Sequence, residues 1–572
     1  MFSGGVSLLS WKRFDVYVKH AYASWLVEHG QVATPDAVPH FVRAVYTEHE
    51  RVWNRFNEPC KPLSYYRKRG LADSPSAHLP CQDKRGECGF VGAFHDIIAN
   101  MSAGGFITDP RYAIGLCGTG LEQGQSAVPV ANGAHRASAA MALGVQPLFT
   151  SPAGKWTGCP TYDHAFFAKL GYPSALSDWV VHRVILSDPA LHVVHIWPRA
   201  LLDASASTLK QVRQVAAKNC STEDGVVYEK RVSLSREAML VYLEHAYGFA
   251  GWVEKGVEAR YRSRLSSGIS ETLLLVVRSD IMRVQQCKNL LRRLFNLPRV
   301  DFKAAVHATD FHSEAIIASE MLLHDTSIAN MNLVGRNLDK AQRMAANRLV
   351  SEIGDDLSRL ISVHGDSIRA PRLVVSGSAR AVLAGKPAQP RLPKMYLLPD
   401  GMMTVTGAAM AMMGLRTHAM RADLAWVPHA MDVDMLMSSD NSSVGPGALI
   451  RSCVHARCQQ TYGSHNPPAS QWHAYNASVP EELIYNPGLH TFCWGMKFLA
   501  LPSLLAYKQR RAAGPAAKKK DIIDAETLVQ VCANHSAACR EDFVLKRRSR
   551  CGARARAQEG KKSNGGKKGK GG

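Results

Sequence analysis

The chain has 572 residues, 46% of them hydrophobic and 20% charged, a composition typical of a globular protein and not of a fibrous or fully disordered one. Because this length exceeds what one hydrophobic core can organise, we expect three domains. The longest mostly apolar stretch, residues 402–415, is shorter than the roughly 18 residues that indicate a membrane span, and we expect no signal peptide. The 13 cysteines are odd in number and scattered, which favours reduced thiols inside a cell.

The net charge of +21 is concentrated near the C-terminus. Residues 546–572 hold eleven Lys or Arg and one Glu, a net of +10, which leaves +11 for the rest of the chain. This segment is rich in Gly and poor in apolar residues, so we expect a disordered tail. It could bind nucleic acid or an anionic surface, or serve only as a solvating tail or an address signal. We expect an intracellular, soluble protein, in the cytoplasm or, through the tail, in the nucleus or nucleolus.

Residues 1–155 are expected to form a first domain that begins with helices. Apolar residues at three- and four-residue spacing predict helices within residues 11–56 and over 91–101. Residues 57–90, rich in Pro, Gly and Lys, predict an irregular insertion between them.

The segment 128–144, VPVANGAHRASAAMALG, predicts a strand, a tight turn and a helix. The turn at Asn132 and Gly133 places His135 and Arg136 in the first turn of that helix. Backbone N–H groups at a helix start attract anions, and an arginine adds a bidentate grip on phosphate. The pattern therefore predicts a phosphate site formed by these four residues. The alternative is a solvated Arg136 and a His135 that only packs or caps.

Residues 156–370 alternate between strand and helix patterns and are expected to form a central domain. Alternation of this kind predicts an α/β layer with a substantially parallel sheet. Strands are expected within residues 191–198, 225–232, 271–278 and 302–310, and helices within 236–249, 284–297 and 313–324.

A group of polar residues, His307, Asp310, His312 and Glu314, falls at one predicted strand-to-helix turn of this domain. They could be metal ligands, proton-transfer groups or part of a phosphate site, and His307 and Asp310 are candidate catalytic residues. The alternative is structural: Asp310 caps the following helix, and Glu314 interacts with its positive N-terminus.

After a linker at residues 371–394, residues 395–545 are expected to form a last domain. Its MDVDMLM segment places Asp432 and Asp434 two apart, so on a strand both side chains share one face. Two acids in an apolar frame are costly unless a cation lies between them, which predicts a Mg²⁺ site with a catalytic role. Lys497 is a candidate for neutralising phosphate charge. The alternative is a solvated strand edge.

The segment 128–144 resembles the nucleotide-binding turn of the ParB/sulfiredoxin superfamily, in which a Gly-x-His-Arg sequence holds nucleotide phosphates. Ala134 stands where sulfiredoxins carry their catalytic cysteine, and Ala137 stands where the ParB box has a second arginine. Some relatives are small-molecule kinases, including a free-serine kinase. Its TYDHAFFAKLGY and CKNLLRRLFNL segments also resemble an uncharacterised bacterial family from surface-polysaccharide gene clusters. Proteins of that family have an aspartate at the position of Asn132.

The last domain is similar to minimal nucleotidyltransferase-fold proteins, in which a glycine turn opens a helix and a D-x-D strand follows. By that resemblance, Gly407 corresponds to the glycine turn and Asp432 and Asp434 to the acids. Thr-Gly-Ala replaces the usual Gly-Gly or Gly-Ser, and the gap to Asp432 is longer than the family pattern. The departures are also compatible with a fold that has lost its activity.

Together these features predict a multidomain protein of mixed α/β class. The favoured function is a Mg²⁺-dependent phosphoryl or nucleotidyl transferase that uses ATP or CTP and acts on a small molecule, sugar or glycan precursor. The alternatives are a ParB-like, nucleotide-switched protein that binds nucleic acid, and an inactive scaffold that retains both folds.

Overall fold

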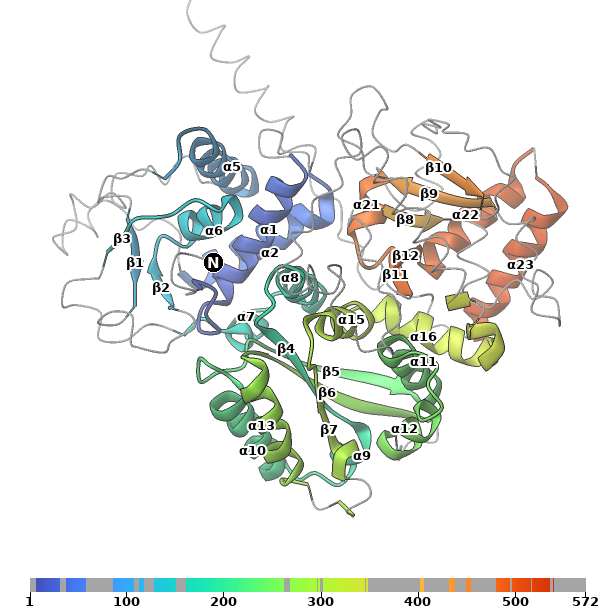
Figure 1. The fold of residues 1–572 in the computed structure, drawn as a ribbon. Helices are drawn as coiled ribbons and strands as arrows, with labels where there is room; N and C mark the ends of the chain where they lie inside the picture. Colours follow the sequence, from blue (N-terminus) through green and yellow to red (C-terminus); the bar gives the residue numbers. More distant parts are fainter. Residues whose placement is uncertain are drawn as a thin grey trace, which may run out of the picture.

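The computed structural model has three parts: a mostly helical N-terminal part, a central part built on a four-stranded sheet, and a C-terminal part built on a five-stranded sheet (Figure 1). In the described residues, helix and sheet are mixed as expected, and no helix is long and apolar enough to cross a membrane. The structure describes residues 7–30, 38–57, 86–106, 113–117, 128–150, 161–261, 268–295, 297–298, 302–344, 346–347, 402–405, 432–437, 449–453, 480–493, 496–515, 517–534 and 539.

The N-terminal part packs helices around one almost completely buried helix. This helix, α1 (Phe14–Glu28), contacts α2 (His40–Asn57), α6 (Ala134–Leu143) and α8 of the central part. Another helix, α5 (Gly86–Gly104), covers α6. A small sheet has the order β2-β1-β3, with β1 antiparallel to β2 and parallel to β3. Its strands are β1 (Ile114–Leu116), β2 (Val130–Asn132) and β3 (Phe149–Thr150).

The expected strand, turn and helix of residues 128–144 are confirmed as β2 and α6. The helices expected within 11–56 and over 91–101 are also confirmed. Of the expected insertion, residues 58–85 lie outside the described part of the chain, and the expectation is wrong for residues 86–90, which begin α5.

The central part alternates strands with helices, as its sequence pattern predicts. Its elements are α7 (His164–Lys169), α8 (Ser174–Ser187), β4 (Leu191–Ile196), α9 (Pro198–Leu202), α10 (Ala206–Val215), the π-helix η3 (Ala216–Cys220), β5 (Tyr228–Ser235), α11 (Arg236–Tyr247), α12 (Val253–Arg260), β6 (Ile269–Arg278), α13 (Ile281–Arg292), α14 (Phe302–Ala305), β7 (Val306–Ala308), α15 (His312–Leu322) and α16 (Asp325–Asn337).

The expected parallel sheet is wrong, because every neighbouring pair of the central sheet is antiparallel. The strand order is β5-β6-β4-β7. Strands β4 and β5 run in the same direction, and so do β6 and β7, as helical crossovers require. In the sheet, however, β6 lies between β4 and β5, and β4 lies between β6 and β7. This is the strand order and connectivity of the split βαβ, or ferredoxin-like, arrangement, and α11 and α12 lie between β5 and β6.

Helices cover both faces of this sheet (Figure 1). One face packs on the two crossovers, α9–η3 and α13–α14, through a core that includes Val194 and Ile196 of β4. The other face packs on α8, α11 and α15 and belongs to a larger core that continues into both other parts of the chain. Because alternate side chains of a strand point to opposite faces, His195 lies on this second face.

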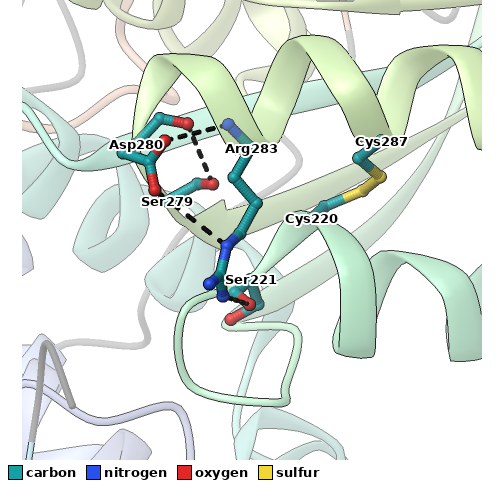
Figure 2. Close-up of a disulfide and its surroundings, with 6 residues drawn as sticks. All are labelled: Cys220, Ser221, Ser279, Asp280, Arg283 and Cys287. Carbon is teal, nitrogen blue, oxygen red and sulfur yellow. Dashed lines mark hydrogen bonds and ion pairs between the residues drawn. A yellow bond between two sulfur atoms is a disulfide. The ribbon is translucent and has the colours of Figure 1, made fainter. Parts of the chain in front are cut away.

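A disulfide joins the two crossovers. Cys220 at the end of η3 is bonded to Cys287 of α13, with their Cα atoms 5.1 Å apart, and Figure 2 shows the bond between the two helices. A hydrogen bond of 2.8 Å from Arg283 Nη1 to the Ser221 carbonyl ties the same two elements. The Asp280 side chain accepts the backbone N–H of Arg283 at 2.9 Å and so caps α13.

The expectation that the cysteines are reduced is therefore wrong for Cys220 and Cys287, for Cys532 and Cys539, which form another disulfide, and for Cys117, which is also disulfide-bonded. The first pair is separated by 67 residues. Its members meet because both crossovers pack on one face of the sheet, which neither the number nor the spacing of cysteines reveals.

The C-terminal part has a sheet of order β10-β9-β8-β12-β11, in which only β8 and β12 are parallel among the described pairs. The Thr326 hydroxyl of α16 contacts it, lying 2.6 Å from the carbonyl of Pro487 and 2.8 Å from that of His490, and its one hydrogen is donated to either or shared between them. The expected linker (371–394) and tail (546–572) lie outside the described residues. The elements are β8 (Met402–Val405), β9 (Asp432–Met437), β10 (Leu449–Cys453), α21 (Pro480–Tyr485), β11 (His490–Cys493), β12 (Met496–Leu499), α22 (Leu501–Ala513) and α23 (Lys519–Asn534).

We predict that Cys287→Ser makes opening of α13 more favourable, because the open segment is no longer tethered to η3 and gains more conformational entropy. A loop of this length corresponds to about 4 kcal/mol at most. Hydrogen exchange of the α13 amides should become faster, and treating the unmodified protein with a reductant should reproduce the change. Equal exchange in the variant and the oxidised unmodified protein would contradict the prediction.

Candidate functional site

The turn that opens α6 needs its glycine. Gly133 has φ +84° and ψ 28°, a left-handed conformation that other residues adopt at a cost. A Cβ built on it would lie 3.1 Å from Arg136 Nη2, so the guanidinium group lies against the turn. Glycine has no side chain that could cap the first-turn N–H groups of α6. Asn132 ends β2 directly before this turn and pairs with Gly115 of β1.

His135, in the first turn of α6, is held by two residues of α2. Its Nε2 lies 2.9 Å from the Tyr46 hydroxyl and 3.7 Å from Glu50 Oε1. The rings of Tyr46 and Phe94 meet the imidazole edge to face. The side chain of His135 stays 30% exposed, so its ring is positioned and still accessible.

Behind this histidine, buried charges link α1 to α2. Lys19 Nζ lies 3.2 Å from Glu50 Oε1 and 3.6 Å from Asp15 Oδ2, and Arg13 Nε lies 2.8 Å from Asp15 Oδ1. Burial by itself would raise the pKa of Glu50, but Lys19 and the neighbouring histidines outweigh it and hold the pKa well below its usual range. Glu50 therefore stays ionised behind His135.

A second group of polar residues surrounds the cross-strand pair of His195 and His307 on β4 and β7. The Tyr242 hydroxyl lies 3.0 Å from His195 Nε2, and the Tyr247 hydroxyl lies 2.8 Å from His307 Nε2. Burial lowers the pKa of His195 to about 3. Burial, His195 and nearby cations lower the pKa of His307 well below its usual value. Both imidazoles are therefore neutral near pH 7.

The expected helix cap at Asp310 is wrong, because the N-cap of α15 is Phe311 and carries no side-chain cap. Asp310 instead accepts from Lys288 Nζ of α13 at 2.6 Å. Glu314 reaches back and accepts the backbone N–H of Asp310 at 2.7 Å, and its Oε2 lies 3.8 Å from His307 Nε2. Burial and the charge of Asp310 raise the pKa of Glu314 to about 7.

The four polar residues of 306–315 do not form a metal site. His312 Nε2 contacts the Ile185 carbonyl at 2.5 Å, away from His307 and Asp310. Within the described ranges, no three His, Cys, Asp or Glu residues are grouped so that they could hold a metal ion. The structure instead brings His307, Asp310 and Glu314 together with Lys288.

Asp432 and Asp434 lie on β9 between β8 and β10. Asp434 is opposite Val405 and Arg451, and Asp432 is opposite Cys453. The two positions are two residues apart, so they share a face of the sheet. The side chains of this strand lie outside what the structure describes, and so does Gly407.

Lys497 lies on β12, separated from β9 by β8. It is buried and donates to the Ile484 carbonyl at 3.1 Å, and its Nζ lies 5.5 Å from the ring centre of Tyr485. Its ammonium group is thus engaged with α21. Figure 1 places the C-terminal sheet and α6 on different sides of the α1–α2 pair, so the structure does not bring β9 and the glycine turn together.

The sequence patterns did not single out several residues of these two groups. Glu50 and Tyr46 are unremarkable in the pattern of α2 and acquire a role only by packing on α6. His195 and Lys288 did leave a signal, since each interrupts an apolar pattern, in LHVVHI and in CKNLLRRL. A polar residue at a buried position of a strand or helix indicates that a partner exists, although not which one.

No protein-family model, no curated protein and no solved structure matches this chain.

We predict that Glu314→Gln reduces the pH dependence of stability between about pH 4.5 and 7. The folded-state pKa of about 7 exceeds the ordinary value of 4.5, so over this range the folded protein binds more protons than the unfolded chain. The stability that the group contributes is present below pH 4.5 and lost as the pH rises through 7, about 3 kcal/mol in all. The melting temperature of both proteins, measured at each pH, tests this.

In that comparison, the unmodified protein should lose stability relative to the variant as the pH rises. Parallel curves would show that Glu314 titrates normally. The glutamine keeps an oxygen for the Asp310 N–H, so a general structural defect should not imitate the result.

Proposed function

We propose that this protein is a nucleotide-dependent transferase, a Mg²⁺-dependent phosphoryl or nucleotidyl transferase that uses ATP or CTP and acts on a small molecule or glycan precursor. The observation that carries the proposal is the glycine turn before α6, where Arg136 lies against Gly133 and His135 is held by Tyr46.

In this proposal, the turn binds the phosphates of the nucleotide. The first-turn N–H groups of α6 and the positive end of its dipole suit an anion. Arg136 would contact phosphate oxygens in a bidentate manner, and His135 would donate from the ring that Tyr46 and Glu50 orient. Asn132 would line the same turn from the end of β2.

Asp432 and Asp434 would hold Mg²⁺, since two carboxylates on one face of a strand are the kind of ligand that this ion prefers. A bound Mg²⁺ would neutralise phosphate charge and orient the groups that react. Lys497 could assist only by leaving the Ile484 carbonyl that it contacts. His307, with Asp310 and Glu314 beside it, would serve proton transfer in the central part.

A second candidate is a nucleotide-switched protein that binds nucleic acid through residues 546–572. The eleven Lys or Arg of that segment favour it, since clustered cations bind phosphate backbones in a salt-dependent manner. Under both candidate functions, we propose an intracellular, soluble protein.

We predict that Arg136→Ala weakens binding of ATP or CTP roughly tenfold or more, because the phosphates lose a charged, bidentate partner. Gly133→Ala should act in the same direction by straining the turn. Calorimetry on the full chain, with and without Mg²⁺, measures the affinities. Arg231→Ala is a matched control, since this arginine lies on β5 and pairs with Glu271.

The same titrations separate the candidates. Mg²⁺-dependent binding that Asp432→Asn abolishes, together with turnover of the nucleotide, supports the transferase. Binding without turnover, with nucleic-acid binding that disappears when residues 546–572 are removed, favours the second candidate. If none of the variants changes the heat of nucleotide binding, both proposed sites are contradicted. If the protein binds no nucleotide, an inactive scaffold is favoured.

A further inference from the structure

The cluster around His195 and His307 contains buried hydrogen-bond donors without partners. In the described part of the chain, Trp197 Nε1 and Arg260 Nε make no hydrogen bond, and Trp197 stacks on the buried His195. Trp197 is 0% exposed, so bulk water does not serve its indole N–H. An unpaired buried donor is costly, because the hydrogen bond that it made to water in the unfolded chain is not replaced.

These three side chains lie against one another. The rings of His195 and Trp197 stack with centres 5.0 Å apart and planes 17° apart. The Arg260 guanidinium lies 6.0 Å from the ring centre of Trp197 and 5.9 Å from that of Trp252. The unpaired donors thus belong to one place, where β4, β7 and α12 meet.

The same place has more positive than negative charge. Lys288 is paired with Asp310, whose charge also acts on Arg292, but neither Arg260 nor Arg292 forms an ion pair with a carboxylate among the described residues. Both arginines act on His307, whose pKa burial, His195 and Lys288 also lower. Glu314, the other acid present, has a pKa raised to about 7 by burial and is only partly ionised near neutral pH. Two arginines in a half-buried cluster are costly without an anion.

The cluster has a buried floor and an accessible rim. His195, Trp197 and Tyr242 are buried, whereas the Trp252 side chain is 41% exposed and Tyr247 and Arg260 are half-buried. An indole at the rim, next to an arginine, can stack on a ring while the arginine holds a charged group.

We propose that this cluster, formed by β4, β7, α12 and α13, binds the phosphate group of a small, ring-bearing phosphate monoester. The phosphate dianion offsets the charges of Arg260 and Arg292 and accepts from their guanidinium groups, and the ring of the ligand packs on Trp252. The inference does not depend on nucleotide binding at Gly133, because the two places share no residue.

The test is calorimetric titration of the full chain with inorganic phosphate and with glucose 6-phosphate, at fixed ionic strength. Arg260→Gln should weaken both probes roughly tenfold or more. Trp252→Ala should weaken glucose 6-phosphate and spare inorganic phosphate. The matched control Arg231→Gln should change neither affinity, and Arg136→Ala is titrated beside it to recognise binding at the glycine turn.

Circular dichroism and melting curves show whether each variant is folded. If Arg260→Gln does not fold, Arg292→Gln replaces it with the same expected loss. The proposal is wrong if the unmodified protein binds neither probe, if Arg136→Ala removes the binding, or if all variants bind equally. It is also wrong if glucuronate binds and both phosphates do not, since the site would then recognise a carboxylate.

Discussion

The pairing of β4 along both edges is the constraint on which the central part depends. Because β6 and β7 flank it in antiparallel register, β4 is buried on both faces and His195 is set opposite His307. The same pairing places α9 and α13 on one face and α11 and α15 on the other. Tyr242 of α11 and Lys288 of α13 therefore approach this strand pair at different points, Tyr242 at His195 and Lys288 at Asp310, just beyond the end of β7.

Buried charge in this protein is mostly compensated locally. The glycine turn follows this rule, since Glu50 behind His135 is balanced by Lys19. Against that background, Arg260 and Arg292 make no ion pair with a described carboxylate, although the charge of Asp310 acts on Arg292. Buried cations without an ion-pair partner are expected at a site where a bound anion supplies the opposite charge. Other compensated pairs are Arg13–Asp15, Arg278–Asp188, Arg343–Glu244, Lys230–Asp178 and Lys508–Asp524.

The disulfide relates to the same cluster through α13. Cys287 is fixed to Cys220, and the next residue, Lys288, holds Asp310. One turn further on, Arg292 donates to the carbonyl of Val306 at the start of β7. A covalent tie at this point limits how far α13 can slide along the sheet, so it also fixes the positions of these two cations.

The sequence by itself determined most elements of the described chain and the local chemistry of the turn. An exception is the strand expected within 302–310, where residues 302–305 form helix α14 and only 306–308 form β7. Helix and strand identities follow from the spacing of apolar residues, and the turn at Gly133 follows from the turn propensities of its residues. Both depend only on residues a few positions apart in the chain. Tertiary structure alone decided the direction of the central strands, the disulfide partners, and the change of Asp310 from a helix cap to the partner of Lys288. Each of these depends on which distant segment inserts beside another, and that choice is made by packing, which leaves no local pattern.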